Sequence, residues 1–387
     1  MIAPREGVPV PRAADAAGIV SWVHFGDLHM TDREQQNYRD LQAIIGEVNT
    51  HMSDSISFVY LPGDNADHGS AEEYELVREA MDRLLVPWYA IVGDHDVHAG
   101  SLANFRRYLM PVPAFSFEVS DYRFLALNAF EFEDPKVFDL SEDQLNRLEQ
   151  ELAETQRRHE RTVLLLHCYP SDLGSPAARL RSLILAYKVL LVGMGHTHYN
   201  EIAHDGNAIY TATRSTGQIE EGPVGFSVTN LDHGVVSWCF KPLGNWPFVM
   251  ITTPSDQRLI SDPTSSDQVV RGVISIRARA WSTQPITSCK LRFSHTELAM
   301  RQVPNSRVWT TDVDTTELVD GSHLMQVVCR DAAGRTASDV IRLYLNQSGR
   351  YEEPLRRPRD QDNASGPWLE RGILGTQLGP NKNGRKW

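Results

Sequence analysis

Five short polar motifs follow apolar runs in the first half of the chain, and each is rich in residues that bind metal ions. In order, they are Asp27-Leu28-His29, Gly63-Asp64-Asn65, Gly93-Asp94-His95-Asp96, His167 and Gly195-His196-Thr197-His198. Continuous apolar runs of this kind are typical of strands that are buried on both faces. We therefore expect these aspartates and histidines to converge at the ends of neighbouring strands. Their oxygen and nitrogen atoms suffice for two metal ions, which predicts metal-assisted hydrolysis.

The same half of the chain alternates between strand-like and helix-like segments, which predicts an α/β core. Ser70 with Glu73 and Ser141 with Gln144 have the spacing of a capping box, which marks the start of a helix. A β-rich hairpin over residues 115–130 interrupts the alternation. The strand candidates are residues 19–25, 56–61, 88–92, 162–166 and 188–192, followed by 208–213, 225–230 and 235–241.

The pattern changes in the last third of the chain. Residues 252–268 are rich in Thr, Ser, Asp and Pro, which is typical of a linker. From 269 to 346 apolar and polar residues alternate between turn signals, which predicts a small all-β, immunoglobulin-like sandwich. We therefore divide the chain into an α/β domain at residues 1–251, a sandwich at 269–346 and a C-terminal extension at 347–387. The extension is either disordered or packed against the body or a neighbouring subunit.

Composition and charge exclude several classes of partner. The chain of 387 residues has a net charge of −12, whereas nucleic-acid binders normally carry a basic surface. No apolar run approaches the roughly 18–20 residues of a membrane helix, so we expect no membrane partner. The cysteines are far apart and form no CxxC pair, so we expect buried thiols and a reducing, cytoplasmic location. They are Cys168, Cys239, Cys289 and Cys329.

The spacing within the motifs suits shared ligation of metal ions. Asp27 and His29 alternate, so in an extended segment both side chains can face one ion. Gly63 permits a tight turn that exposes the carboxylate of Asp64, and this carboxylate can bridge two ions with its two oxygens. His95 lies beside the ligand candidates and can donate a proton.

The ordered set resembles the calcineurin-like metallophosphoesterase superfamily over residues 19–241. The resemblance implies a four-layer α/β/β/α sandwich of two mixed sheets and hydrolysis of a phosphoester by metal-bound hydroxide. It implies that Asp64 bridges the ions, that His95 contacts the phosphoryl group or protonates the leaving group, and that Asp96 orients His95. The first metal would be held by Asp27, His29, Asp64 and His198, and the second by Asp94, His167 and His196, with Asp64 shared.

Two departures refine the expected substrate and metals. The family usually has asparagine where this chain has Asp94, and the extra negative charge favours monoanionic diesters over dianionic monoesters. Purple acid phosphatases have a tyrosine three residues after the bridging aspartate, where this chain has Asp67, so a tyrosinate-ligated ferric site is not expected. The motif order is most similar to bacterial cyclic-nucleotide and glycerophosphodiester phosphodiesterases. Manganese or iron is the expected metal, with zinc or cobalt as alternatives.

The interpretation as a small-molecule phosphodiesterase leaves several alternatives open. A phosphomonoesterase and a nuclease are the other enzymes that fit the motifs. A scaffold of the same fold that binds partners without catalysis is the alternative outside enzymes. The sandwich or the C-terminal extension is expected to mediate any homo-oligomer.

Overall fold

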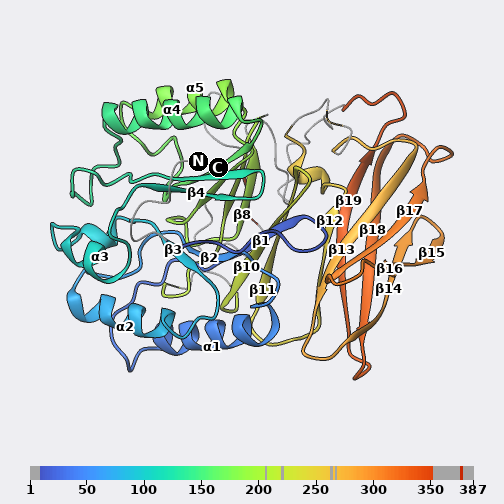
Figure 1. Ribbon diagram of the computed structural model, residues 1–387, viewed down its shortest axis with the longest axis horizontal. Helices are drawn as coiled ribbons and strands as arrows, with labels where there is room; N and C mark the ends of the chain where they lie inside the picture. Colours follow the sequence, from blue (N-terminus) through green and yellow to red (C-terminus); the bar gives the residue numbers. More distant parts are fainter. Residues whose placement is uncertain are drawn as a thin grey trace.

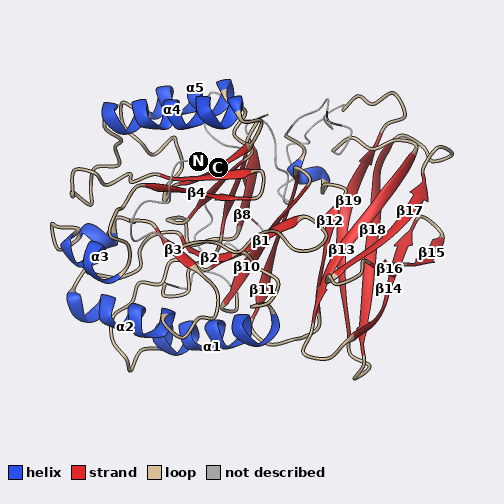
Figure 2. Ribbon diagram, viewed as in Figure 1, coloured by secondary structure: helices blue, strands red, loops and turns tan. Residues whose placement is uncertain are grey.

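The computed structural model describes residues 9–204, 207–218, 222–261, 265, 268–351 and a strand at 375–377. Two β-sheets lie face to face between two layers of helices, and an all-β region packs beside them (Figure 1, Figure 2). The mixed α/β sheets expected from the sequence are thus present. Every helix in the described part of the chain is too short or too polar to span a bilayer.

The first sheet has five strands, three of which are parallel neighbours. β1, β2 and β3 run parallel, while β10 pairs with β1 in the antiparallel direction. Helices α1 (Gln36–His51) and α2 (Ala71–Met81) lie on the outer side of this sheet (Figure 1). In order of pairing, the strands are β11 (Val235–Pro242), β10 (Gly225–Asp232), β1 (Ile19–His24), β2 (Phe58–Leu61) and β3 (Trp88–Ala90).

The second sheet has seven strands, and helices α4 (Glu142–Arg157) and α5 (Ala177–Ala186) cover its outer side (Figure 1). β5, β6, β7 and β9 run parallel, and β4 with β5 forms the expected antiparallel hairpin. In order of pairing, the strands are β20 (Gly375–Gln377), β8 (Glu201–His204), β9 (Ile209–Ala212), β7 (Leu191–Met194), β6 (Arg161–Leu165), β5 (Tyr122–Ala126) and β4 (Phe115–Val119).

Aromatic side chains from both sheets form the centre of the core. The ring of Trp22 on β1 lies 5.4 Å from the ring of Phe124 on β5, and Phe58 on β2 lies 5.1 Å from Phe117 on β4. Tyr89 on β3 stacks on Phe117 at 3.9 Å. Burying a large apolar side chain contributes roughly 1.5–3 kcal/mol, so these rings are a main reason why the two sheets pack together.

The helices begin where local sequence provides caps. At α2, the side chain of Ser70 accepts from the backbone N–H of Glu73, and the Glu73 side chain accepts from the backbone N–H of Ser70, so the predicted capping box is confirmed. Ser141 caps α4 through the N–H of Gln144. The predicted alternation of strands and helices also contains α1, the short α3 (Ala103–Tyr108) and α5, none of which begins with a side-chain cap. Single 3-10 turns occur at His95–Val97 and Gln257–Leu259.

The all-β region consists of two four-stranded antiparallel sheets with an apolar core that includes Ile276, Leu291 and Val327. The buried guanidinium of Arg279 joins this region to the α/β part through an ion pair with Asp15 at 3.1 Å. One sheet contains β12 (Phe248–Thr253), β13 (Val273–Trp281), β17 (Val308–Asp314) and β16 (Arg301–Gln302). The other contains β15 (Thr296–Ala299), β14 (Ile286–Phe293), β18 (Gly321–Asp331) and β19 (Thr336–Leu345).

The domain boundaries drawn from the sequence stay a prediction. Of the proposed C-terminal extension at 347–387, residues 352–374 and 378–387 lie outside the described part of the chain. The described strand β20 pairs antiparallel with β8, at the edge of the seven-stranded sheet.

Candidate metal centre

All five motifs lie just beyond the carboxyl ends of parallel strands. Each follows its strand by two to four residues, with β1 leading to Asp27, β2 to Asp64, β3 to Asp94, β6 to His167 and β7 to His196. Parallel strands in a sheet end at the same edge, so the motifs of each sheet meet there. The two sheets face each other, and their motifs therefore converge on one place.

The structure brings the seven predicted ligands together in two groups. Within each group, one potential ligand atom per residue lies within 4.8 Å of the others. Asp64 lies between the groups, because its Oδ2 is 3.6 Å from Nε2 of His29 and 3.6 Å from Nε2 of His167. The first group is Asp27, His29, Asp64 and His198, and the second is Asp94, His167 and His196.

Four of these residues have a backbone conformation that is unfavourable for any residue but glycine. The φ angles are 41° at His29, 50° at Asp64, 66° at His196 and 62° at His198. Such conformations cost of the order of 1–3 kcal/mol each and persist only where the surrounding structure enforces them. Strain concentrated on ligand candidates indicates that the loops are shaped for a site rather than for stability.

Two glycines of the motifs are required by close approach to carboxylates. A Cβ atom on Gly93 would lie 2.1 Å from Oδ1 of Asp64, and one on Gly195 would lie 2.4 Å from Oδ1 of Asp27. Both distances are far below contact distance, so any side chain at these positions would displace the carboxylate.

The donor atoms fit divalent cations. Oδ1 of Asp27 is buried and has no hydrogen-bond partner among the described residues. Nε2 of His29 faces Nε2 of His198 at 3.0 Å, and burial lowers the pKa of His198 to about 3, with His29 adding to the effect. Two neutral imidazoles with converging nitrogens and an unpaired buried carboxylate oxygen form a site that a cation would complete.

The second group shows the same fit. Nδ1 of His167 contacts the carbonyl oxygen of Pro62 at 2.7 Å, and as the donor it would leave a lone pair on Nε2. That Nε2 faces Oδ1 of Asp94 at 3.2 Å, and Nδ1 of His196 lies at the same distance from this oxygen. Burial opposes protonation of His167, but Asp64 and Asp94 raise its pKa well above the usual range. A cation among these atoms would take the place of that proton.

His95 stands beside both groups and is held by Asp67. Nδ1 of His95 lies 2.8 Å from the backbone oxygen of Asp67 and 3.2 Å from its carboxylate. The ring lies 4.4 Å from that of His29, and its side chain is 24% exposed, so it can meet a substrate. His95 also belongs to two further groups in which one potential ligand atom per residue lies within 4.8 Å of the others. One group contains His29 and Asp67, and the other contains Asp94 and His98.

The expected contact from Asp96 to His95 is not made. Asp96 is fully buried, and its carboxylate accepts from the N–H of Gly93, from both nitrogens of Asn65 and from the hydroxyl of Tyr74. Burial raises the pKa of Asp96 to about 6, and Asp64 adds to the effect. Asp96 therefore ties the Asp64 loop to the Asp94 loop, because its side chain points inward while that of His95 points to the open side.

Residues 21–200 match the family model of the calcineurin-like phosphoesterases. The chain contains a calcineurin-like phosphoesterase domain. Proteins of this family are hydrolases that use divalent metal ions, and the ligand groups described above lie within the matched part or at its edge.

Two similar proteins illustrate the range of the likeness. A probable cyclic nucleotide phosphodiesterase of Synechococcus is 28% identical over 218 residues, which cover 53% of this chain and 78% of that protein. The crystal structure of a dimetal phosphatase from Danio rerio has a TM-score of 0.50 at 14% identity, over 58% of this chain and 97% of that one. The second likeness shows the fold of the phosphoesterase domain.

Two further polar residues, Asp67 and Gln218, lie at the site, and sequence reasoning missed them. The sequence showed only that Asp67 is not a tyrosine, although its position three residues after Asp64 already indicated that it lies near the metal ligands. Nε2 of Gln218 lies 3.2 Å from Nδ1 of His29 and 3.3 Å from the Asp67 carboxylate. No motif marks Gln218, because it reaches the site from a loop that follows β9.

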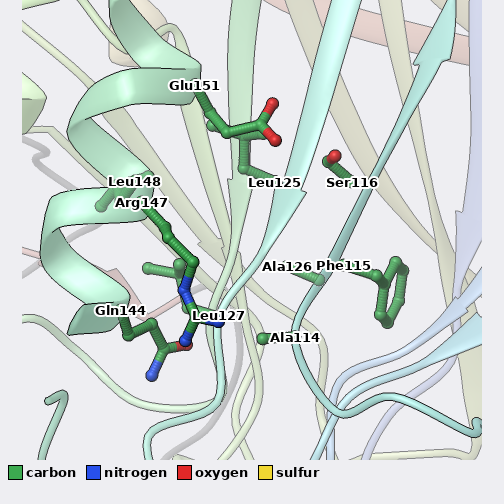
Figure 3. A pocket seen from close by; sticks show the side chains of 10 residues that line it. All are labelled: Ala114, Phe115, Ser116, Leu125, Ala126, Leu127, Gln144, Arg147, Leu148 and Glu151. Carbon is green, nitrogen blue, oxygen red and sulfur yellow. The ribbon is translucent and has the colours of Figure 1, made fainter. Parts of the chain in front are cut away.

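A small pocket of about 60 Å³ elsewhere in the phosphoesterase domain is unrelated to this site. It lies between α4 and the β4–β5 hairpin, and its polar side chains are Ser116, Gln144, Arg147 and Glu151 (Figure 3). None of the seven ligand candidates lines it.

Proposed function

We propose that the chain hydrolyses a phosphodiester at a dinuclear metal centre. The observation that carries the proposal is the pair of ligand groups with Asp64 between them. Asp27, His29 and His198 would hold one ion with Asp64, and Asp94, His167 and His196 would hold the other with the same carboxylate. When bound, two ions supply Lewis-acid activation of a phosphoryl oxygen and of the attacking water.

His95 would protonate the leaving group. Asp67 holds the Nδ1 side of the ring, so Nε2 is the nitrogen available to the substrate. A carboxylate beside Nδ1 fixes the orientation of an imidazole and stabilises its protonated form. Asp67 would therefore act as a positioning residue, in the role that the sequence had suggested for Asp96.

The charge of the second ligand group supports a diester as the substrate. Asp94 places a carboxylate where a neutral amide would also bind metal, and this adds one negative charge next to the phosphoryl position. A dianionic monoester is repelled more strongly than a monoanionic diester by that charge. The similarity to a probable cyclic nucleotide phosphodiesterase supports the same preference.

The other expectations are part of the proposal. Manganese or iron is the proposed metal, with zinc or cobalt as alternatives, since all suit mixed carboxylate and imidazole ligands. We propose a cytoplasmic location, a small-molecule substrate and no nucleic acid as the main partner. The all-β region is proposed to be an immunoglobulin-like module for packing or homo-oligomer formation, not a second enzyme.

The test is hydrolysis by metal-free protein that has been reconstituted with Mn²⁺. Bis(p-nitrophenyl) phosphate and p-nitrophenyl phosphate are compared side by side in the wild type, in His95→Ala and in His233→Ala. His233 is a matched control, because it is exposed, contacts Asp232, and lies at the end of the first sheet away from the ligand motifs. We expect metal-dependent preference for the diester, loss of at least about 100-fold in His95→Ala, and little change in His233→Ala.

Other outcomes would redirect the assignment. Preference for the monoester would make the chain a phosphomonoesterase and would refute the argument from Asp94. Asp94→Asn should raise monoesterase activity relative to diesterase activity, and an unchanged ratio would refute it as well. Failure to bind two metal ions per chain would indicate a scaffold of this fold.

A further inference from the structure

One aromatic side chain borders the open side of the metal centre. Of the seven ligand candidates, His196 is the most exposed, at 34% of its side chain, so the centre is most open to solvent beside this residue. The ring of Phe138 lies 5.1 Å from the ring of His196 at an interplanar angle of 64°. Phe138 is half-buried and belongs to the segment that joins β5 to α4.

The position of Phe138 is fixed from two directions. Its ring packs edge-on against Phe130 at 5.0 Å, and the fully buried Phe130 in turn contacts His167 at 5.8 Å. Its backbone oxygen accepts a hydrogen bond from the N–H of Gly174 at 3.1 Å. An aromatic surface that is already ordered loses little conformational entropy when a ligand packs on it.

The surface beside His29, in the first ligand group, is polar. His95 and His98 lie there with their rings 4.3 Å apart, and both contact the backbone oxygen of Asp67. The two ester groups of a bound diester would therefore meet different surfaces, one with proton donors and the other with an aromatic ring.

We propose that Phe138 is a specificity-determining residue that packs against a flat ring on one ester group of the substrate. This inference rests on the proposed function and names its substrate class, a phosphodiester with an aromatic ester group such as a nucleoside. The ring would rest on Phe138 while His95 faces the leaving group.

The test measures binding and needs no turnover. Adenosine 5′-monophosphate and ribose 5-phosphate are titrated calorimetrically into the full chain loaded with Mn²⁺. We expect the adenosine compound to bind roughly tenfold more tightly, as stacking of one base on an aromatic side chain predicts. Phe138→Ala should remove that difference in affinity, while the Kd of ribose 5-phosphate should change by no more than about twofold. Phe132 lies in the same segment and is 59% exposed, so Phe132→Ala should preserve the difference.

Each contrary outcome is informative. Equal binding of the two compounds to the wild type, a difference that survives in Phe138→Ala, or no binding of either compound would overturn the inference. If binding behaves as expected but no diester is hydrolysed, the proposed function fails while the role of Phe138 in binding stands.

A second inference concerns two cysteines far from this site. Cys289 on β14 and Cys329 on β18 are directly opposite each other, both side chains are buried, and the Cys329 thiol raises the pKa of the Cys289 thiol. The carbonyl oxygen of Cys289 accepts from Met300, on the side away from β18. The N–H and C=O of a strand residue point the same way, so this is a non-hydrogen-bonded pair, in which Cα atoms are about 4.5 Å apart. That separation falls within the range of disulfides.

We infer that a peroxide oxidises this pair to a disulfide that links β14 to β18. Each thiol gives up one proton and one electron, an S–S bond forms, the O–O bond of hydrogen peroxide breaks, and two waters leave. The site is independent of the proposed function, because it lies in the all-β region.

Thiol counting after treatment of the full chain with hydrogen peroxide tests this inference. The four free cysteines should fall to two, with peptide mapping linking Cys289 to Cys329. Cys168→Ser should still lose two thiols, whereas Cys289→Ser should lose none by this route. The inference is overturned if all four thiols remain in moderate urea, where the oxidant has access, or if the missing thiols map to Cys168 and Cys239.

Discussion

The buried histidine on β1 should make the stability of this chain depend on pH below neutrality. His24 is 1% exposed, packs at 4.7 Å against the ring of Tyr60, and has no hydrogen-bond partner for Nε2 among the described residues. Burial lowers the pKa of His24 to about 3, against 6.5 in an exposed histidine. Above pH 6.5 the ring is neutral in both the folded and the unfolded chain, and it favours neither.

Below pH 6.5 only the unfolded chain takes up the proton, so a falling pH favours unfolding. Each pH unit between 6.5 and 3 costs about 1.4 kcal/mol from this one group. Between pH 7.5 and pH 5 the free energy of unfolding should therefore fall by about 2 kcal/mol through His24 alone. Below pH 3 both states bind the proton, and this contribution stops growing.

Urea unfolding of the wild type and of His24→Phe at pH 7.5 and pH 5 isolates this contribution. Other titrating groups are common to both proteins, so the difference between their two pH slopes belongs to His24. The variant should lose about 2 kcal/mol less than the wild type between the two pH values. His24→Gln, which keeps a polar side chain without a proton to gain in this range, should behave like His24→Phe. Identical pH slopes in the wild type and both variants would refute the reasoning.

Three further perturbations follow from contacts in the structure. Gly195→Ala places a Cβ 2.4 Å from the Asp27 carboxylate, and calorimetry should show Mn²⁺ binding weakened at least about tenfold. Gly46→Ala is the control, because its Cβ would meet no atom within 4 Å, and it should leave Mn²⁺ binding unchanged. Asp96→Ala leaves the buried donors of Gly93, Asn65 and Tyr74 without their acceptor and should cost about 3 kcal/mol in urea unfolding; a loss below about 1 kcal/mol would contradict this role. Arg279→Ala removes a fully buried cation that contacts Asp15, Ser21 and Ser55. The free energy of unfolding should fall by about 3–5 kcal/mol. An unchanged urea denaturation midpoint would contradict this expectation.

Much of the architecture was predictable where the signal is local. Ser70 and Ser141 marked helix starts because capping involves only the first turn of a helix. The strand expected at 188–192 begins later, at Leu191, because the N–H of Val189 still bonds back to the carbonyl oxygen of Ile184 in the preceding helix. The bounds of helix α1 were not predicted, although Leu41, Ile44, Ile45 and Val48 have helical spacing and are buried.

The candidate site was predictable as a set of residues, but its internal contacts were not. The motifs predicted the ligand candidates because metal binding depends on residue type, and the buried strands before them set their direction. The partner of His95 is Asp67 and not its neighbour Asp96, since successive side chains of a tight turn point to different sides. No short sequence pattern identifies Gln218 as a neighbour of His29.

The sequence by itself determined which residues end each buried strand and which side chains share one face of a strand or helix. Both depend only on how apolar and polar residues repeat over a few positions. The tertiary structure alone decided which strands are neighbours. β1 pairs with β10, so that Ile19 lies opposite Asp232. The entropy of closing a loop changes only slowly with its length, so distance along the chain selects no partner. Packing of the two apolar sheet faces makes that choice, and it is this packing that places Asp64 between His29 and His167.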